Sequence, residues 1–166
     1  MAKYKSQRVG VFVDVQNMYY SAKNLYEAKV NFLKLLDYAA SGREMVRAIA
    51  YVVKGPQSEE DNFFTALSKI GFEVKTRDLQ VFFGGAKKGD WDVGMCMDAI
   101  RMAQKLDVVV LVSGDGDFEP LVNYLKYSQG CVVEVMAFGR TASSKLKEAA
   151  DEFIDLENDK KFLIKR

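Results

Sequence analysis

The chain has 166 residues, of which 49% are apolar and 28% charged, with a formal net charge of +1 and no histidine. This is the composition of a globular protein without a general basic field, so a nucleic acid would need a local patch to bind. The absence of histidine excludes Ser-His-Asp and Cys-His catalysis and imidazole zinc sites, and any metal must be held by oxygen ligands, which favours Mg²⁺, Mn²⁺ or Ca²⁺.

Strand and helix patterns alternate through the first half of the chain. The N-terminal residues 1–8 are polar and lack the apolar core of a signal peptide. A strand is predicted over 8–15, followed by helical segments over 18–28 and 32–40 that break near Asn31. A second strand covers 45–54, and a helix opened by the acidic residues 58–61 ends at Gly71.

The second half continues the alternation. A short polar strand at 72–76 suits a sheet edge, residues 79–83 extend it or form a small hairpin strand, and 84–90 form a loop. A helix over 91–106, a strand over 108–112, a helix over 118–128 and a strand over 131–138 follow, and the chain then predicts a short helix over 143–150 and a last strand over 153–156.

The alternation predicts one domain over residues 1–166. Its architecture is a three-layer α/β/α fold with a central, mainly parallel sheet of five to six strands. The core runs from about 9 to 156, and 157–166 form a charged C-terminal extension whose apolar residues, 162–164, could pack against a partner in a homodimer. Cys96 and Cys131 lie in apolar segments and are expected to be reduced thiols of a cytoplasmic protein. No apolar run approaches the roughly 18 residues that span a bilayer.

The motif with the clearest chemistry follows the apolar run 108–112. This run delivers Asp115 and Asp117, separated by Gly116, to the carboxyl end of a strand buried on both faces. Asp117 alone could cap the next helix, but that would leave Asp115 without a role beside a like charge. A bound hard cation would relieve this repulsion, so the pair favours a metal site.

A second aspartate ends the first strand. Asp14 is equally well explained as the N-cap of the following helix and as a metal ligand, with Asn17 one helical turn further along. If the strand order reverses between the first and fourth strands, their ends are neighbours about 4.8 Å apart and can share an ion.

Other groups carry weaker signals. Asp90 or Asp92 caps the helix that follows Lys87 and Lys88, two lysines that could also bind phosphate. Asp98 lies six residues beyond Asp92 and so on another side of an ideal helix. Tyr19, Tyr20, Phe82 and Phe83 could stack on unpaired bases, although aromatic side chains more often pack in a core. Dinucleotide-binding, P-loop and EF-hand motifs are absent from the sequence.

Taken together, three motifs resemble the LabA-like branch of the NYN domain family, which has a PIN-like nuclease fold. They are Asp14-Val-Gln-Asn17, the set Lys88-Gly89, Asp92-Val93 and Asp98, and Ser113-Gly-Asp115-Gly-Asp117-Phe118-x-Pro120-Leu121. Ser143 or Ser144, Leu146 and Ala150-Asp151-x-Phe153 resemble the family's C-terminal signature. The resemblance runs from about residue 9 to residue 156.

The resemblance implies a Rossmann-like domain whose acidic pocket binds Mg²⁺ or Mn²⁺ and processes RNA. Carried over by position, the acidic set is Asp14, Asp92, Asp115 and Asp117, with Asn17 and Ser113 in support and Asp98 as a further frequent acid. The resulting hypothesis is a metal-dependent ribonuclease acting on single-stranded RNA, with Lys87, Lys88, Lys23 and Tyr19 contacting the substrate. The alternatives are a regulatory RNA- or protein-binding module that retains the pocket and a metal-dependent phosphatase acting on a small molecule.

Overall fold

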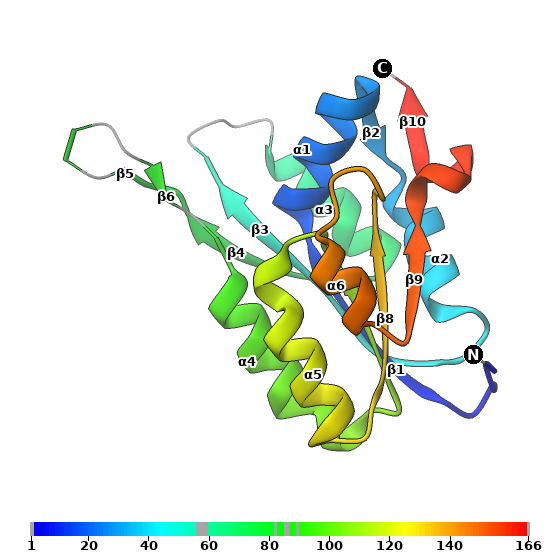
Figure 1. The fold of residues 1–166 in the computed structure, drawn as a ribbon. Coiled ribbons are helices and arrows are strands. Elements are labelled where there is room, and N and C mark those ends of the chain that lie inside the picture. Colours follow the sequence, from blue (N-terminus) through cyan, green and yellow to red (C-terminus); the bar gives the residue numbers. More distant parts are fainter. Residues whose placement is uncertain (1, 56–59, 82, 85–86, 89, 166) are drawn as a thin grey trace.

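A six-stranded parallel sheet forms the middle layer of the computed structural model, which describes residues 2–55, 60–81, 83–84, 87–88 and 90–165 (Figure 1). The strand order is β4-β3-β1-β7-β8-β9, and every neighbouring pair is parallel. The strands are β1 (Arg8–Asp14), β3 (Glu44–Lys54), β4 (Glu73–Asp78), β7 (Val108–Val112), β8 (Val132–Ala137) and β9 (Glu152–Asp155). The predicted α/β class, the parallel sheet and the edge position of the polar strand are confirmed.

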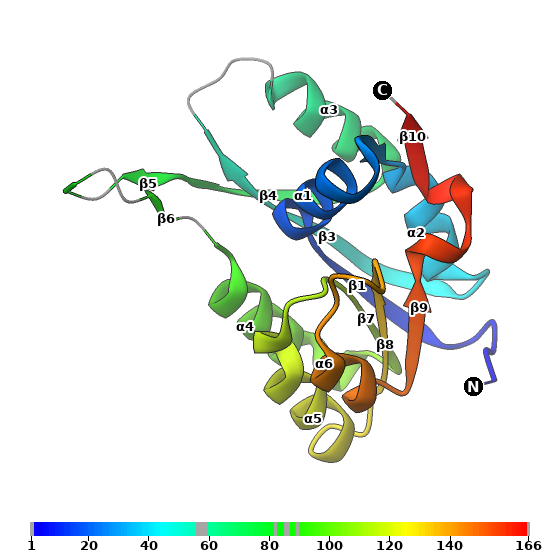
Figure 2. The same cartoon turned by 45° about the horizontal axis from the view of Figure 1, so that its top comes forward.

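Helices cover both faces of this sheet (Figure 2). One face carries α1 (Val15–Tyr26), α2 (Phe32–Ala40) and α3 (Glu60–Ile70), and the other carries α4 (Asp92–Met102), α5 (Glu119–Tyr127) and α6 (Ser144–Ala149). Alternate residues of each strand feed the two resulting cores. In β7, Val110 packs on the α1 side while Leu111 packs on the α5 side, and the whole strand is buried. The apolar run of β7 therefore reflects burial on both faces.

The chain reverses its direction across the sheet between β1 and β7. From β1 it proceeds outward to β3 and β4, and it then returns through α4 to β7, β8 and β9. Val13 of β1 pairs with Val112 of β7, so the carboxyl ends of these two strands are adjacent. This is the topological switch point at which open α/β sheets bind ligands.

The region between α1 and α2 differs from the prediction. The predicted helix over 18–28 ends earlier, because Glu27 adopts a left-handed conformation with φ of 50°. A short strand, β2 (Ala28–Val30), follows and pairs antiparallel with β10 (Leu163–Lys165). Three residues are too few for the alternation pattern to be recognised, and the pairing partner lies at the far end of the chain.

The C-terminal segment folds back onto the domain. It contains the 3₁₀ turns η3 (Leu156–Asn158) and η4 (Lys160–Phe162) before β10. Phe162 is 2% exposed, and its ring centroid lies 5.6 Å from that of Tyr38. Phe162 and Leu163 therefore pack within the chain, whereas Ile164 is 49% exposed. A homodimer stays a prediction.

A hairpin extends away from the body between β4 and α4 (Figure 1). Its strands are β5 (Gln80–Val81) and β6 (Lys87–Lys88), which pair antiparallel. The hairpin alternative for 79–83 is confirmed, while the expectation of a continuous loop over 84–90 is wrong at β6. Two further 3₁₀ turns, η1 (Ala103–Lys105) and η2 (Gly116–Phe118), end α4 and precede α5. The helices predicted over 91–106 and 118–128 are therefore shorter than expected.

Two features of the interior bear on stability. The Arg43 guanidinium donates two hydrogen bonds to the Glu134 carboxylate, at 2.9 and 3.0 Å, and both side chains are buried. Cys96 and Cys131 are free thiols, as predicted. Among the described residues, no helix combines the length and the apolar character that a membrane span requires.

Candidate metal centre

Asp14 joins the two strands at the switch point. Its Oδ1 accepts a hydrogen bond from the Asn17 backbone N–H at 3.2 Å, so it is the N-cap of α1, as one of its two interpretations predicted. Its Oδ2 accepts a hydrogen bond from the Ser113 hydroxyl at 3.1 Å. Burial raises the pKa of the Asp14 carboxyl, and the hydrogen bonds from Asn17 and Ser113 partly oppose that shift. Capping therefore places a carboxylate directly beside the end of β7.

The loop after β7 is held against α1 by its backbone. The Gly114 N–H donates to Asn17 Oδ1 at 3.0 Å, and the Asp115 N–H donates to Ser113 Oγ at 3.2 Å. A Cβ atom on Gly114 would lie 3.0 Å from the Cα of Ala142, so the close approach of the loop after β8 favours glycine at this position. Asn17 and Ser113 thus support the acidic loop.

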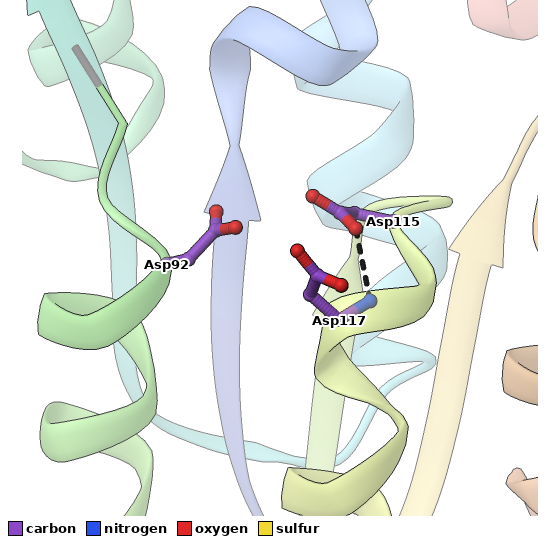
Figure 3. A group of neighbouring side chains, drawn as sticks. All are labelled: Asp92, Asp115 and Asp117. Atoms are coloured by element: carbon purple, nitrogen blue, oxygen red, sulfur yellow. Dashed lines mark hydrogen bonds between the residues drawn. The ribbon is translucent and has the colours of Figure 1, made fainter. Parts of the chain in front are cut away.

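Asp115 is the N-cap of η2, since its Oδ1 accepts from the Asp117 N–H at 2.9 Å. The sequence offered Asp117 as a possible cap of the next helix, but α5 has Phe118 at its N-cap position with no side-chain cap hydrogen bond, and Asp117 lies inside η2. Asp117 is exposed at the rim of the loop. Both carboxylates remain on the open side of the sheet edge, where Figure 3 shows them together.

Asp92 reaches the same place from α4, on the other side of β1 (Figure 3). The preceding Trp91 fixes this helix start: its Nε1–H donates to the Val52 carbonyl at 3.0 Å, and its ring lies 5.4 Å from that of Tyr51. The Arg77 guanidinium lies 4.4 Å from the centroid of the Trp91 ring. Trp91 therefore anchors the first turn of α4 to β3 and β4.

Asp92, Asp115 and Asp117 form a compact group. One carboxylate oxygen from each lies within 4.8 Å of the others. Burial, followed by the negative charges of Asp115, Asp90 and Asp14, raises the pKa of Asp92 to about 7. Carboxylates this close repel one another, and a divalent cation with oxygen ligands is the partner that relieves the repulsion. The donor set therefore fits Mg²⁺ or Mn²⁺ and offers no sulfur or nitrogen ligand to softer metals.

The group opens into a hollow of about 500 Å³. Of the described residues that line it, five are aspartates and none is lysine or arginine. The full lining is Asp14, Gln16, Asn17, Tyr20, Ser21, Asn24, Asp90, Asp92, Asp115, Asp117 and Thr141. Sequence reasoning missed Gln16, Ser21, Asn24 and Thr141 as lining residues. The signal available for three of them was the polar face of α1, because 16, 20 and 24 are spaced by four residues and 17 and 21 follow the same spacing.

Other predicted site residues lie outside the hollow. Asp98 is buried and accepts hydrogen bonds from the Tyr51 hydroxyl and the Lys75 ammonium, each at 2.8 Å, and from Arg101. It therefore ties α4 to β3 and β4. Lys23 lies 5.9 Å from the centroid of the Tyr19 ring, and neither residue is part of the described lining. The side chains of residues 87 and 88, and all of residue 82, lie outside what the structure describes.

Known proteins are similar to this chain over nearly its whole length. Residues 8–157 match the profile of the NYN domain. The low amplitude and bright protein LabA of Synechococcus elongatus is 27% identical over 98% of this chain and 90% of its own length. A crystal structure of a Vibrio parahaemolyticus protein of unknown function superposes with a TM-score of 0.89 and 34% identity, covering 99% of this chain and 100% of that one.

Proposed function

The chain belongs to the NYN domain family, and we propose from this premise that it is a metal-dependent ribonuclease that cleaves single-stranded RNA. The observation that carries the proposal is the convergence of Asp92, Asp115 and Asp117 at the switch point of the sheet. The family's kinship with PIN-type nucleases supports RNA as the substrate. The absence of histidine is compatible with hydrolysis that needs no imidazole base.

Asp92, Asp115 and Asp117 would hold a Mg²⁺ or Mn²⁺ ion, and Asp14 is proposed as a fourth acidic member. Asp14 accepts one hydrogen bond on each oxygen, and each oxygen retains a second lone pair. When bound, such an ion supplies an activated water and neutralises charge at the scissile phosphate.

The chain's own residues set the conditions for that chemistry. Asn17 and Ser113 hold the loop after β7 in place, so Asp115 and Asp117 keep their separation when charged substrate approaches. Trp91 fixes the start of α4 and with it Asp92. With a pKa of about 7, Asp92 binds or releases a proton near neutral pH in the free protein. The pocket is thus poised to exchange a proton for a cation.

The test measures cleavage of a labelled single-stranded RNA by the purified chain in Mn²⁺ and in EDTA. Cleavage product is expected in Mn²⁺ but not in EDTA, and it should be lost in the Asp92→Asn and Asp115→Asn variants. Asparagine retains a side-chain oxygen that can accept the hydrogen bond from the Asp117 N–H, so Asp115→Asn preserves the η2 cap. Asp37→Asn is the matched control, because this exposed aspartate lies on α2 outside the pocket. Equal cleavage by the wild type and the two site variants would refute the proposal.

A second candidate is a regulatory RNA- or protein-binding module that retains the acidic pocket. The observation that favours its protein-binding form is the lack of lysine and arginine among the described lining residues, because affinity for the RNA backbone ordinarily depends on such cations. RNA binding without any Mn²⁺-dependent product would select this candidate over the nuclease.

A further inference from the structure

The hollow has a second wall whose chemistry differs from that of the carboxylates. It consists of Gln16, Asn17, Tyr20, Ser21 and Asn24 on one face of α1, together with Thr141 from the loop after β8. We call these six residues the α1 wall. Their polar groups are all amides and hydroxyls, whereas the opposite face of α1 buries Val15, Met18 and Ala22 in the core. The division of the helix is therefore sharp: one face holds the fold together, and the other faces the pocket.

Tyr20 is the only large aromatic side chain among the described lining residues, and it is 50% exposed. Its ring meets the ring of Tyr19 edge-on, with centroids 5.4 Å apart and planes at 79°. An aromatic ring that stays half in solvent beside a polar pocket offers a surface on which a flat ligand can stack. Base stacking on such a ring contributes about 1–3 kcal/mol per base.

The loop after β8 closes the wall at its far side. The Thr141 hydroxyl donates a hydrogen bond to the Ser21 hydroxyl at 3.4 Å, and the adjoining Ala142 packs against Gly114 of the acidic loop. The α1 wall and the carboxylates are thus parts of one structural unit. A ligand that reaches the carboxylates therefore also meets Tyr20 and its polar neighbours.

The functional groups of the wall indicate which part of a ligand it contacts. Amides and hydroxyls both donate and accept hydrogen bonds, as the edges of nucleobases and ribose hydroxyls require. Phosphates are usually bound by lysine and arginine, and the described lining contains neither. The wall is therefore suited to a base and its sugar, and the phosphate is left to the cation that the carboxylates would hold.

We propose that the α1 wall binds one unpaired base of single-stranded RNA, which stacks on Tyr20 while the adjoining phosphate faces the carboxylates. The inference rests on the proposed function for the phosphate half of this arrangement. A base held in a duplex is paired and stacked on its neighbours, so it cannot enter without being splayed out. The wall thus gives the site a physical basis for preferring single strands.

The test uses a short RNA in which one base is 2-aminopurine, whose fluorescence falls when it stacks on another ring. The wild type, Tyr20→Phe, Tyr20→Ala and the control Tyr127→Ala are titrated in Mn²⁺. Tyr127 is 79% exposed at the end of α5 and outside the described lining. Circular dichroism melting establishes that each variant is folded. Cleavage of the same RNA is followed in parallel on gels.

Tyr20→Ala is expected to weaken RNA binding by at least about fivefold and to lose most of the quenching, in keeping with the loss of one stacked base. Tyr20→Phe and Tyr127→Ala should match the wild type, and a strand whose bases have been removed should bind the wild type and Tyr20→Ala equally. Unchanged binding and quenching in Tyr20→Ala would overturn the inference while leaving the nuclease intact. Tyr20-dependent quenching without any Mn²⁺-dependent product would support the wall and refute the nuclease.

Discussion

Replacement of Asp92 by asparagine should stabilise the metal-free protein and weaken metal binding at the same time. Burial and neighbouring carboxylates raise the pKa of Asp92 from 3.8 to about 7. A raised pKa means that the folded state favours the protonated carboxyl. The protonated Asp92 carboxyl contributes fully to stability below about pH 4, the ordinary pKa of an aspartate. This contribution is lost as the pH rises through 7.

The size of the effect follows from the shift. From 3.8 to about 7, at 1.36 kcal/mol for each pKa unit, the shift corresponds to at most about 4 kcal/mol. Asp92 is only half-buried, and solvent screening reduces this to roughly 1–2 kcal/mol. Asparagine carries no charge, so at pH 8 in EDTA the variant should melt a few degrees above the wild type. At pH 4 the difference should disappear.

The melting temperatures are measured by circular dichroism in four conditions: at pH 4 and at pH 8, each with EDTA or with saturating Mn²⁺. In Mn²⁺ at pH 8 the order should reverse, because the ion stabilises the folded wild type by binding it. Asp37→Asn should follow the wild type throughout. A lower melting temperature for Asp92→Asn at pH 8 in EDTA would show that the three carboxylates do not oppose one another, and the electrostatic reasoning for a cation site would fail.

Three further predictions concern the same site and its support. Below pH 7 the affinity for Mn²⁺ should fall by up to about tenfold per pH unit as Asp92 becomes protonated, and it should level off above pH 8; calorimetric titration across this range would also detect the released proton. Trp91→Ala should cost about 2–4 kcal/mol in urea denaturation and weaken Mn²⁺ binding, and an unchanged Mn²⁺ affinity would contradict its anchoring role. Arg43→Met should cost about 3–5 kcal/mol by leaving Glu134 charged and unpaired, and the double variant Arg43→Met/Glu134→Met should recover most of that loss.

The sequence predicted the strands that position the site because buried strands are recognised from local patterns. The apolar run before Ser113 and the apolar strand before Asp14 are each long enough to be recognised as buried strands. If the strand order reverses between these two strands, their carboxyl ends are neighbours at the point where open parallel sheets bind ligands. The sequence predicted neighbouring ends on the condition that the strand order reverses there, and the observed pairing of Val13 with Val112 meets that condition.

What the sequence could not supply depends on contacts between distant segments. β2 forms because β10 pairs with it, and residues 28–30 contain no pattern that predicts a partner more than 130 residues away. The 3₁₀ turn η2, which Asp115 caps and which contains Asp117, comes between β7 and α5, and no pattern in the sequence indicated it. Contact of Lys23 and Tyr19 with substrate stays a prediction; the sequence named Tyr19 and Tyr20 together, and the structure places only Tyr20 in the described lining.

Asp92 is held by a different kind of constraint from the other acidic residues. Asp14 ends β1 and Asp115 follows the neighbouring β7, so the hydrogen bonds of the sheet and of Ser113 determine their separation. Asp92 follows the hairpin and belongs to no strand, and its position depends on Trp91, which donates a hydrogen bond to the β3 backbone and packs on Gly94. The distance between the two halves of the acidic group is therefore set by side-chain packing and can be altered without disturbing the sheet. Substitutions at Trp91 should consequently change how well the carboxylates fit a cation while β1 and β7 stay in register.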